Sequence, residues 1–273
     1  MKILLSWSTG KDSAWTLHVL RQQGANVAGL LTSVNETAGR VSMHGVRKEI
    51  LGAQAGAAGL PCAIFRGYIG GGLYHSQNIE GWLTTLPGIR VVVPAFADDA
   101  AGLLRTAIRS RGVTVYLEPK FLYNLPAARA KVRPGFAVPF GKARTRRSGT
   151  DLTIVAYGTP VHFALEAAAA LEKEGKSVEV IDLRSLVPLD IETVLASVKR
   201  TSRALVAHED KVHGGFGGEV ASQIQQAAFA WLDAPVGRVG STFTPVGFSR
   251  ILERAILPSA EKVLAAAKQA LEY

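Results

Sequence analysis

Short apolar runs of strand length alternate with segments of helix length through residues 151–273, and this alternation constrains the fold more than any other feature. Two of the runs, 152–156 and 178–182, are rich in Val and Ile. The segments that follow them, 161–174 and 191–198, have the apolar spacing of helices. Strands separated by helices of this length favour a parallel sheet covered on both faces. We therefore expect residues 151–273 to form a complete α/β domain.

A polar cluster lies well before this region, directly after a turn of three glycines at 70–72. It consists of Tyr74, His75, Ser76 and Gln77, and an apolar-periodic segment follows it. Ser76 is placed to cap a helix in that segment, because serine is a preferred N-cap residue. The sequence therefore predicts that the cluster sits at the start of a helix.

A βαβ unit is predicted next. A β-branched run at 91–93 predicts a strand, Asp98 and Asp99 open a helical pattern, and 113–117 is typical of the following strand. The apolar face of that helix is expected to carry Leu103, Leu104, Ala107 and Ile108. A polar cluster at a helix start, in front of a parallel βαβ unit, is the usual place for a ligand in an open α/β sheet.

Four motifs carry a resemblance to a known family, and they lie at 74–77, 87–92, 102–104 and 117–120. In this order and spacing the chain resembles the beta subunit of the thiamine-diphosphate-dependent 2-oxoacid dehydrogenases, of the branched-chain or pyruvate type. The resemblance continues to the C-terminus, where the chain is similar to the C-terminal domain of transketolases. It implies a partial transketolase pyrimidine-binding domain at 66–124 and a complete transketolase C-terminal-like domain at 151–273.

The same resemblance implies roles for the polar cluster. His75 would be catalytic in handing the acyl group to lipoamide, a task that suits an imidazole near neutral pH, while Tyr74, Ser76 and Gln77 would lie near the cofactor. The implied cofactor is thiamine diphosphate, shared with an alpha subunit. The other implied partners are a lipoyl acyltransferase core and a second copy of the C-terminal domain. Because the resemblance begins only near Arg66, the family's cofactor-activating glutamate has no counterpart in residues 1–65.

Residues 1–65 follow a different pattern, in which a short apolar run at 2–6 leads through a small-residue loop into an amphipathic helix. Backbone N–H groups and the positive end of the helix dipole would face a phosphate there, and Lys11 adds a full charge. The glycine spacing is not that of a Walker loop. The residues expected to hold a diphosphate are Ser8, Gly10, Lys11, Asp12 and Ser13.

This loop resembles the pyrophosphate loop of the ATP pyrophosphatase superfamily, and motifs at 43–47 and 54–55 extend the resemblance to its diphthine-ammonia ligase branch. The resemblance implies that ATP binds to a Rossmann-like segment. Thr9 stands where a glycine is common, and a β-branched residue restricts the backbone. Strands are expected at 2–6, 27–32 and 63–65, fewer than the roughly five strands of such a sheet. We therefore expect this segment to bind ATP but not to catalyse the complete ligase reaction.

The net charge of +9 does not predict a nucleic-acid site, because of where the charge lies. Most of the excess falls within 66–150, above all in a basic linker predicted at 125–150. Its cations have no acidic neighbour in the sequence: Lys131, Arg133, Lys142, Arg144, Arg146 and Arg147. A nucleic-acid surface would interleave aromatic residues with these charges, and only Phe136 and Phe140 are present. A solvated interdomain linker or a subunit contact is favoured over a polyanion site.

Cys62 is the only cysteine, which excludes an internal disulfide and fits a cytoplasmic location. No segment approaches the roughly 20 apolar residues of a membrane span, so no membrane partner is expected.

His208, Glu209 and Asp210 are consecutive on a strand end and cannot all face one ion, so no metal site is predicted. The glycine-rich loop at 214–218 could hold an anion, but such loops more often allow a sharp turn at a subunit interface.

Three functional interpretations remain open. The first is a beta-subunit-like component of a 2-oxoacid dehydrogenase complex, inactive if the missing glutamate region is essential. The second is an ATP-binding adenylating ligase of the diphthine-ammonia ligase type. The third is a non-functional fusion of two gene fragments, suggested by the change of family resemblance within 61–70. The first is preferred because it accounts for most of the residues.

Overall fold

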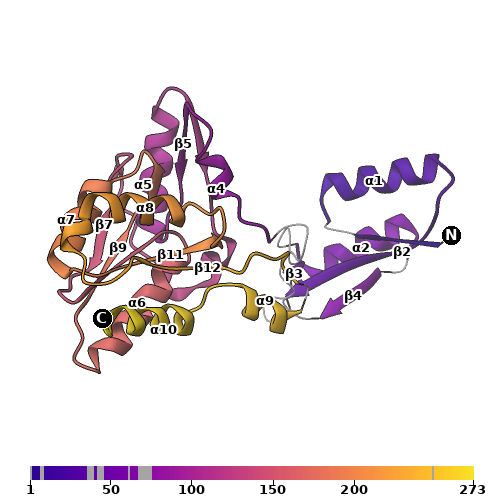
Figure 1. Ribbon diagram of the computed structural model, residues 1–273. Coiled ribbons are helices and arrows are strands. Elements are labelled where there is room, and N and C mark those ends of the chain that lie inside the picture. Colours follow the sequence, from indigo (N-terminus) through magenta and orange to yellow (C-terminus); the bar gives the residue numbers. More distant parts are fainter. Residues whose placement is uncertain are drawn as a thin grey trace. The chain divides into compact units, whose positions relative to one another are not determined.

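The computed structural model describes residues 2–6, 9–35, 40–41, 46–60, 62–66, 76–247 and 249–273. The chain divides into two compact units, each with its own hydrophobic core (Figure 1). Unit 1 comprises Met1–Ser76 with Gly247–Ile251, and unit 2 comprises Gln77–Val246 with Leu252–Tyr273. Among the described residues, no helix is both long and apolar enough to cross a bilayer.

Unit 1 holds a four-stranded sheet within its described residues. Its strands are β1 (Lys2–Ser6), β2 (Asn26–Asn35), β3 (Arg40–Val41) and β4 (Cys62–Arg66). Strand β2 pairs in parallel with β1 and β4 and antiparallel with β3. Helices α1 (Lys11–Gln22) and α2 (Lys48–Ala58) pack onto it through a core that includes Leu17, Leu30 and Leu51. The three strands predicted for residues 1–65 are confirmed, and Leu5 of β1 and Leu30 of β2 contribute to this core.

The predicted βαβ unit opens the regular part of unit 2. It consists of β5 (Ile89–Val92), α5 (Ala97–Arg109) and β6 (Val113–Tyr116), and the two strands pair in parallel. A third strand, β10 (Ser185–Val187), pairs antiparallel with β5 and completes the sheet. That strand belongs to the region in which the sequence predicted a separate domain.

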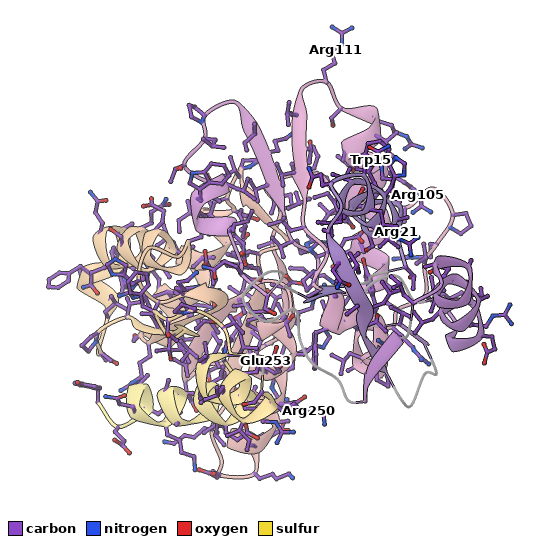
Figure 2. The ribbon with its side chains drawn as sticks, turned by 90° about the vertical axis from the view of Figure 1, so that its right-hand side faces the viewer. Trp15, Arg21, Arg105, Arg111, Arg250 and Glu253 are labelled. Carbon is purple, nitrogen blue, oxygen red and sulfur yellow. The ribbon has the colours of Figure 1, made fainter. Side chains whose placement is uncertain are left out.

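The buried face of α5 differs from the predicted one. Leu103 is fully buried, but Leu104 is 43% exposed and Ile108 is 76% exposed. The helix instead turns Asp99 and Gly102 inward, and a Cβ atom on Gly102 would lie 2.7 Å from Val138 Cγ2. Arg111, two residues beyond the end of α5, is exposed, and Figure 2 shows its side chain extending away from the ribbon. The prediction was right for Leu103 but wrong for Leu104 and Ile108, because Asp99 and Gly102 are buried in their place.

The second sheet of unit 2 has five strands in the order β12-β11-β8-β9-β7. These are β7 (Arg144–Arg147), β8 (Leu152–Ala156), β9 (Val178–Asp182), β11 (Ala204–Lys211) and β12 (Gly237–Ser241). All neighbours pair in parallel except β7, which runs antiparallel to β9. The alternation in the sequence thus predicted the parallel part of the sheet correctly.

Helices cover both faces of this sheet, as predicted (Figure 1). One face packs against α7 (Ile191–Thr201) and α8 (Gly217–Ala228), and the other packs against α6 (Pro160–Glu172) and α10 (Ala260–Leu271). The remaining elements are α4 (Glu80–Leu83), α9 (Arg250–Ile256) and the 3-10 turns η1 (Lys120–Asn124), η2 (Pro126–Ala128) and η3 (Phe229–Trp231).

The βαβ unit and the larger sheet share one hydrophobic core. Val91 and Val93 pack in the same cluster as Val155, Tyr157 and Ile224. Each of these five side chains is 3% exposed or less. The two regions that the sequence assigned to separate domains are therefore parts of one packed unit.

The end of the basic linker is ordered, in contrast to the solvated segment that the sequence predicted. Residues Arg144–Arg147 form β7 at the sheet edge. The Arg146 side chain is 8% exposed and contacts both Asp99 and Asp182. Arg147 pairs with Glu172 at 2.7 Å. These cations lack acidic neighbours in the sequence only because their partners lie on other elements.

Candidate functional site

The residues predicted to be functional are only partly within the described structure. Tyr74 and His75 lie outside the described residues. Ser76 is half-buried and Gln77 is exposed. Helix α4 begins at Glu80, and its N-cap is Ile79 without a side-chain cap. The predicted capping role of Ser76 is therefore wrong, because the helix starts further along the chain.

The N-terminal loop has the predicted strand-loop-helix arrangement. Ser8 lies outside the described residues, Gly10 is the N-cap of α1, and Lys11 is exposed at the first helical position. Asp12 is also exposed, whereas Ser13 is 9% exposed. Residues 10–13 therefore form the start of a twelve-residue helix with an exposed cation.

The backbone of this loop is strained at Thr9, whose φ is 67°. A positive φ is unusual for a non-glycine residue and is least tolerated by β-branched side chains. The Gln54 side chain donates a hydrogen bond to the Thr9 carbonyl at 3.4 Å. The position where the sequence departs from the expected glycine is thus a position whose conformation favours glycine.

Unit 2 contains a buried polar cluster that sequence reasoning did not identify as a site. Its members are Glu80, Tyr157, His208, Glu209 and Asp210, which come from α4, β8 with its following turn, and the end of β11. In the sequence, the signal was a run of three polar residues at the end of an apolar strand. That run suggested only a metal site, which was not predicted.

His208 is held between glycines. A Cβ atom at Gly215, Gly217 or Gly240 would lie within 3.0 Å of the imidazole ring, at 2.7, 2.2 and 2.9 Å respectively. The ring stacks on Tyr157, with centroids 6.4 Å apart, and neither ring nitrogen has a hydrogen-bond partner among the described residues. Burial lowers the pKa of His208 to about 4, so the ring is neutral at physiological pH.

The carboxyl groups of the cluster influence one another electrostatically. Burial, with smaller contributions from the nearby Asp210 and Glu209, raises the pKa of Glu80 to about 8. Burial also raises the pKa of Glu209, and it raises the pKa of the Tyr157 hydroxyl well above its ordinary value. The cluster can therefore hold a proton on a carboxyl group at neutral pH, because like charges in a low-dielectric site cannot all ionise.

Asp210 connects the cluster to α4. Its Oδ2 accepts a hydrogen bond from the backbone N–H of Gly81 at 3.0 Å, and its Oδ1 accepts one from the N–H of Lys211 at 2.8 Å. The Lys211 ammonium lies 3.9 Å from Oδ1. Residues that are 129 positions apart are thus joined directly through a buried carboxyl group.

An open groove of about 530 Å³ borders the cluster. Gly81, Gly214 and Gly215 form part of its lining, together with Leu186, Phe216 and Arg238. Gly214 has a φ of 73°, so the predicted sharp turn in the glycine-rich loop is confirmed. The groove therefore follows the seam between α4 and the loop that connects β11 to α8.

The described residues do not form a cofactor site by themselves. Among them, no group of three or more His, Cys, Asp and Glu side chains is arranged to hold a metal ion. Thiamine diphosphate, as implied by the family resemblance, needs a carboxylate that reaches its aminopyrimidine ring. Glu80 and Asp210 are 5% and 6% exposed, whereas Glu209 is half-buried. The Glu80 and Asp210 carboxyl groups are therefore enclosed by protein atoms rather than open to a ligand.

Two family models match the chain. Residues 43–126 match the transketolase pyrimidine-binding domain, and residues 141–263 match the transketolase C-terminal domain. The first match begins within the region for which the sequence predicted a ligase resemblance, and neither match supports that ligase resemblance.

Similar proteins include beta subunits of the pyruvate dehydrogenase E1 component. The mitochondrial beta-1 subunit of Arabidopsis thaliana is 38% identical over 259 residues, which cover 90% of this chain and 71% of the relative. The mitochondrial beta-2 subunit of Oryza sativa subsp. japonica is 40% identical over 222 residues, which cover 79% of this chain. The chain spans 59% of the length of that rice subunit.

A solved structure of a split-gene transketolase, described as an inactive beta4 tetramer, is similar in fold. The TM-score is 0.61 at 24% identity, and the match covers 96% of this chain and 81% of the other. The α/β fold predicted from the sequence, with its transketolase-like regions, is thus confirmed.

Proposed function

The chain belongs to the family of the beta subunits of the pyruvate dehydrogenase E1 component, and from this premise we propose that it acts as the beta-type subunit of a 2-oxoacid dehydrogenase. The observation that carries the proposal is the common core of unit 2. Val91 and Val93 of the βαβ unit pack with Val155 and Ile224 of the C-terminal sheet. Residues 77–126 of the first matched region and most of the second matched region are therefore parts of one folded unit.

The cofactor would be shared with an alpha subunit. Glu80 and Asp210, the carboxyl groups beside the groove at α4, are buried and so do not offer thiamine diphosphate an open carboxylate. When bound, the cofactor supplies the carbanion chemistry.

The role proposed for this chain is acyl transfer and assembly. His75 would take part in handing the acyl group to the lipoyl group of an acyltransferase core, with Tyr74, Ser76 and Gln77 as positioning residues. The C-terminal sheet would support self-association. A cytoplasmic location is part of the same proposal.

Co-expression with an alpha subunit tests this function. The expected result is co-purification of both chains and a thiamine-diphosphate-dependent reduction of an artificial electron acceptor with pyruvate or 3-methyl-2-oxobutanoate. His75→Ala should abolish acylation of a lipoyl domain. Absence of both co-purification and cofactor-dependent turnover, for every alpha subunit tried, would contradict the proposal.

ATP binding by unit 1 is a second candidate function. It is favoured by the exposed Lys11 at the start of α1, directly after the positive-φ backbone of Thr9. ATP should then protect residues 1–65 from proteolysis, and Lys11→Ala should remove the protection. Equal cleavage with and without ATP would exclude the adenylating-ligase interpretation. A non-functional fusion predicts failure of both this assay and the dehydrogenase assay.

A further inference from the structure

The groove beside α4 combines an apolar wall with a cation. It has a volume of about 530 Å³ and lies entirely within unit 2. Leu186, Val187 and Leu189, from β10 and the turn after it, line the groove with aliphatic side chains, and Phe216 adds an aromatic ring. Arg238 of β12 belongs to the same lining. Small-molecule sites have this composition, with a mostly apolar surface and a few polar groups that orient the ligand.

The Arg238 guanidinium lies over the start of α8. Its Nη1 donates to the Val212 carbonyl oxygen at 3.1 Å, and the same atom would lie 3.1 Å from a Cβ atom on Gly218. The side chain is exposed and forms no ion pair with any described residue. Its remaining N–H groups are therefore available to an anion, and a carboxylate matches a guanidinium through two parallel hydrogen bonds.

The first turn of α8 adds backbone donors at the same place. The helix has twelve residues, and its N-cap, Phe216, provides no side-chain cap. The first N–H groups of a helix have no acceptor within it, and the helix dipole favours a negative charge there. The Gly218 N–H donates to the Gly215 carbonyl oxygen at 3.0 Å. The N–H groups of Gly217 and Glu219 have no acceptor among the described residues.

His208 indicates independently that a hydrogen-bonding partner belongs at this place. The residue is fully buried, and neither ring nitrogen has a partner among the described residues. Nε2 would lie 2.5 Å from a Cβ atom on Gly217, and Nδ1 would lie 3.2 Å from one on Gly215, which also lines the groove. Both nitrogens therefore face the residues that lead into α8. Because a buried polar atom without a partner is costly, the ring indicates a bound polar group beside it.

The acids near the groove leave room for a negative charge. Burial raises the pKa of Glu80 to about 8, so this carboxyl group is neutral at pH 7. The Asp210 carboxylate accepts from two backbone N–H groups and has the Lys211 ammonium 3.9 Å away. Glu219 is the only acid among the described lining residues, and its Oε1 accepts from Gln223 Nε2 at 2.7 Å. Glu219 is therefore the lining residue whose charge opposes a bound anion.

We propose that this groove binds a small carboxylate with a short aliphatic chain. The carboxylate would accept from Arg238 and from the first N–H groups of α8, and the chain would lie against Leu186, Val187 and Leu189. Burial of the chain supplies affinity, and the charged end fixes its orientation. The site does not depend on the proposed function, because it uses neither the acyl-transfer segment nor thiamine diphosphate.

An NMR titration of the full chain with hexanoate tests the site. Hexanoate should bind saturably, and each methylene removed from it should weaken binding about two- to fourfold, because the aliphatic chain is buried. Hexanol and hexylamine lack the negative charge and should bind more weakly by about tenfold or more. Equal binding of hexanol and hexanoate, or no saturation at about 20 mM hexanoate, would overturn the proposal.

Two opposite charge changes test how the ligand is oriented. Arg238→Gln should weaken hexanoate binding about tenfold or more, because it removes the cation. Glu219→Gln should tighten binding about threefold, because it removes the opposing charge. Arg109→Gln is the matched control, since Arg109 is an exposed arginine of α5 without an ion pair among the described residues. This control should leave the affinity within about twofold of the wild type.

A variant that fills the groove separates binding there from binding elsewhere on the chain. Thr85 is exposed and lines the groove, so Thr85→Phe should weaken hexanoate binding about fivefold or more without a change in charge. Thermal unfolding checks that each variant is folded. Folded Arg238→Gln and Thr85→Phe proteins that bind hexanoate like the wild type would contradict the assignment. If Arg238→Gln does not fold, unchanged or weaker binding by Glu219→Gln would contradict it instead.

Discussion

Arg146 and Asp182 are joined inside unit 2 by two hydrogen bonds to one carboxylate oxygen. The Arg146 Nε donates to Asp182 Oδ2 at 3.0 Å, and Nη2 donates to the same atom at 2.7 Å. Nη2 also contacts the fully buried Asp99. Burial raises the pKa of Asp182 to about 6, although Arg146 favours its charged form. One arginine of the basic linker thus connects α5 to the C-terminal sheet.

Removing this arginine should destabilise unit 2 strongly. We expect Arg146→Ala to lower the free energy of unfolding by about 3–5 kcal/mol, because it leaves the buried Asp182 without its cationic partner, whereas Asp99 keeps Arg184. The control is Arg147→Ala on the same strand, which removes a pair with the mostly exposed Glu172 and should cost about 1 kcal/mol or less. Urea unfolding followed by circular dichroism measures both. Equal losses in the two variants would contradict the buried role of Arg146.

Glu80 should make the stability of unit 2 depend on pH. Burial raises its folded-state pKa from 4.5 to about 8, so the folded state binds the proton more tightly than the unfolded state does. The stabilisation from this bound proton is complete below pH 4.5 and is lost as the pH rises to about 8. The total loss is on the order of a few kcal/mol. Glu80→Gln should therefore gain stability relative to the wild type between pH 5 and 8.

Thermal unfolding at several pH values measures this difference. The exposed Glu272, changed to Gln, is the control and should leave the pH profile unchanged. A constant difference between Glu80→Gln and the wild type from pH 5 to 8 would show that Glu80 does not retain its proton.

The glycines around His208 should tolerate no side chain while the imidazole is present. A Cβ atom on Gly217 would lie 2.2 Å from His208 Cδ2, so Gly217→Ala should cost about 1–3 kcal/mol through overpacking. Removing the imidazole in the double variant with His208→Ala should make the alanine cost much less. A double-mutant cycle by chemical unfolding measures the coupling. Strictly additive losses would mean that the two residues do not meet.

Strain at Thr9 should be relieved by glycine. Thr9 has a φ of 67°, a conformation that is unfavourable for a β-branched residue. Glycine adopts it without strain, and this gain exceeds the larger chain entropy that glycine loses on folding. Thr9→Gly should therefore stabilise unit 1 by roughly 0.5–1 kcal/mol. Gly59→Ala provides the reverse test, because Gly59 has a φ of 63° with no atom within 4 Å of an added Cβ. It should destabilise unit 1 by roughly 1 kcal/mol. Thermal unfolding of unit 1 measures the direction of the stability change in both variants. A loss of stability in Thr9→Gly would be evidence against backbone strain at this residue.

Local patterns were sufficient to predict most elements. The β-branched run at 91–93 and the acidic residues in the first turn of α5 predicted the βαβ unit, and the alternation after residue 151 predicted a covered parallel sheet. These features depend on periodicity and on capping preferences, which neighbouring residues carry. The family resemblance could be read from the same neighbouring residues.

The sequence by itself determined the α/β class, the strand and helix order and the family of this chain. Only the tertiary structure decided that β10 joins β5, that Arg146 lies between Asp99 and Asp182, and that Asp210 holds Gly81. The reason is physical. Burial and charge pairing depend on which distant segments meet, and a polar residue has the same local sequence signal whether it ends in solvent or in a core.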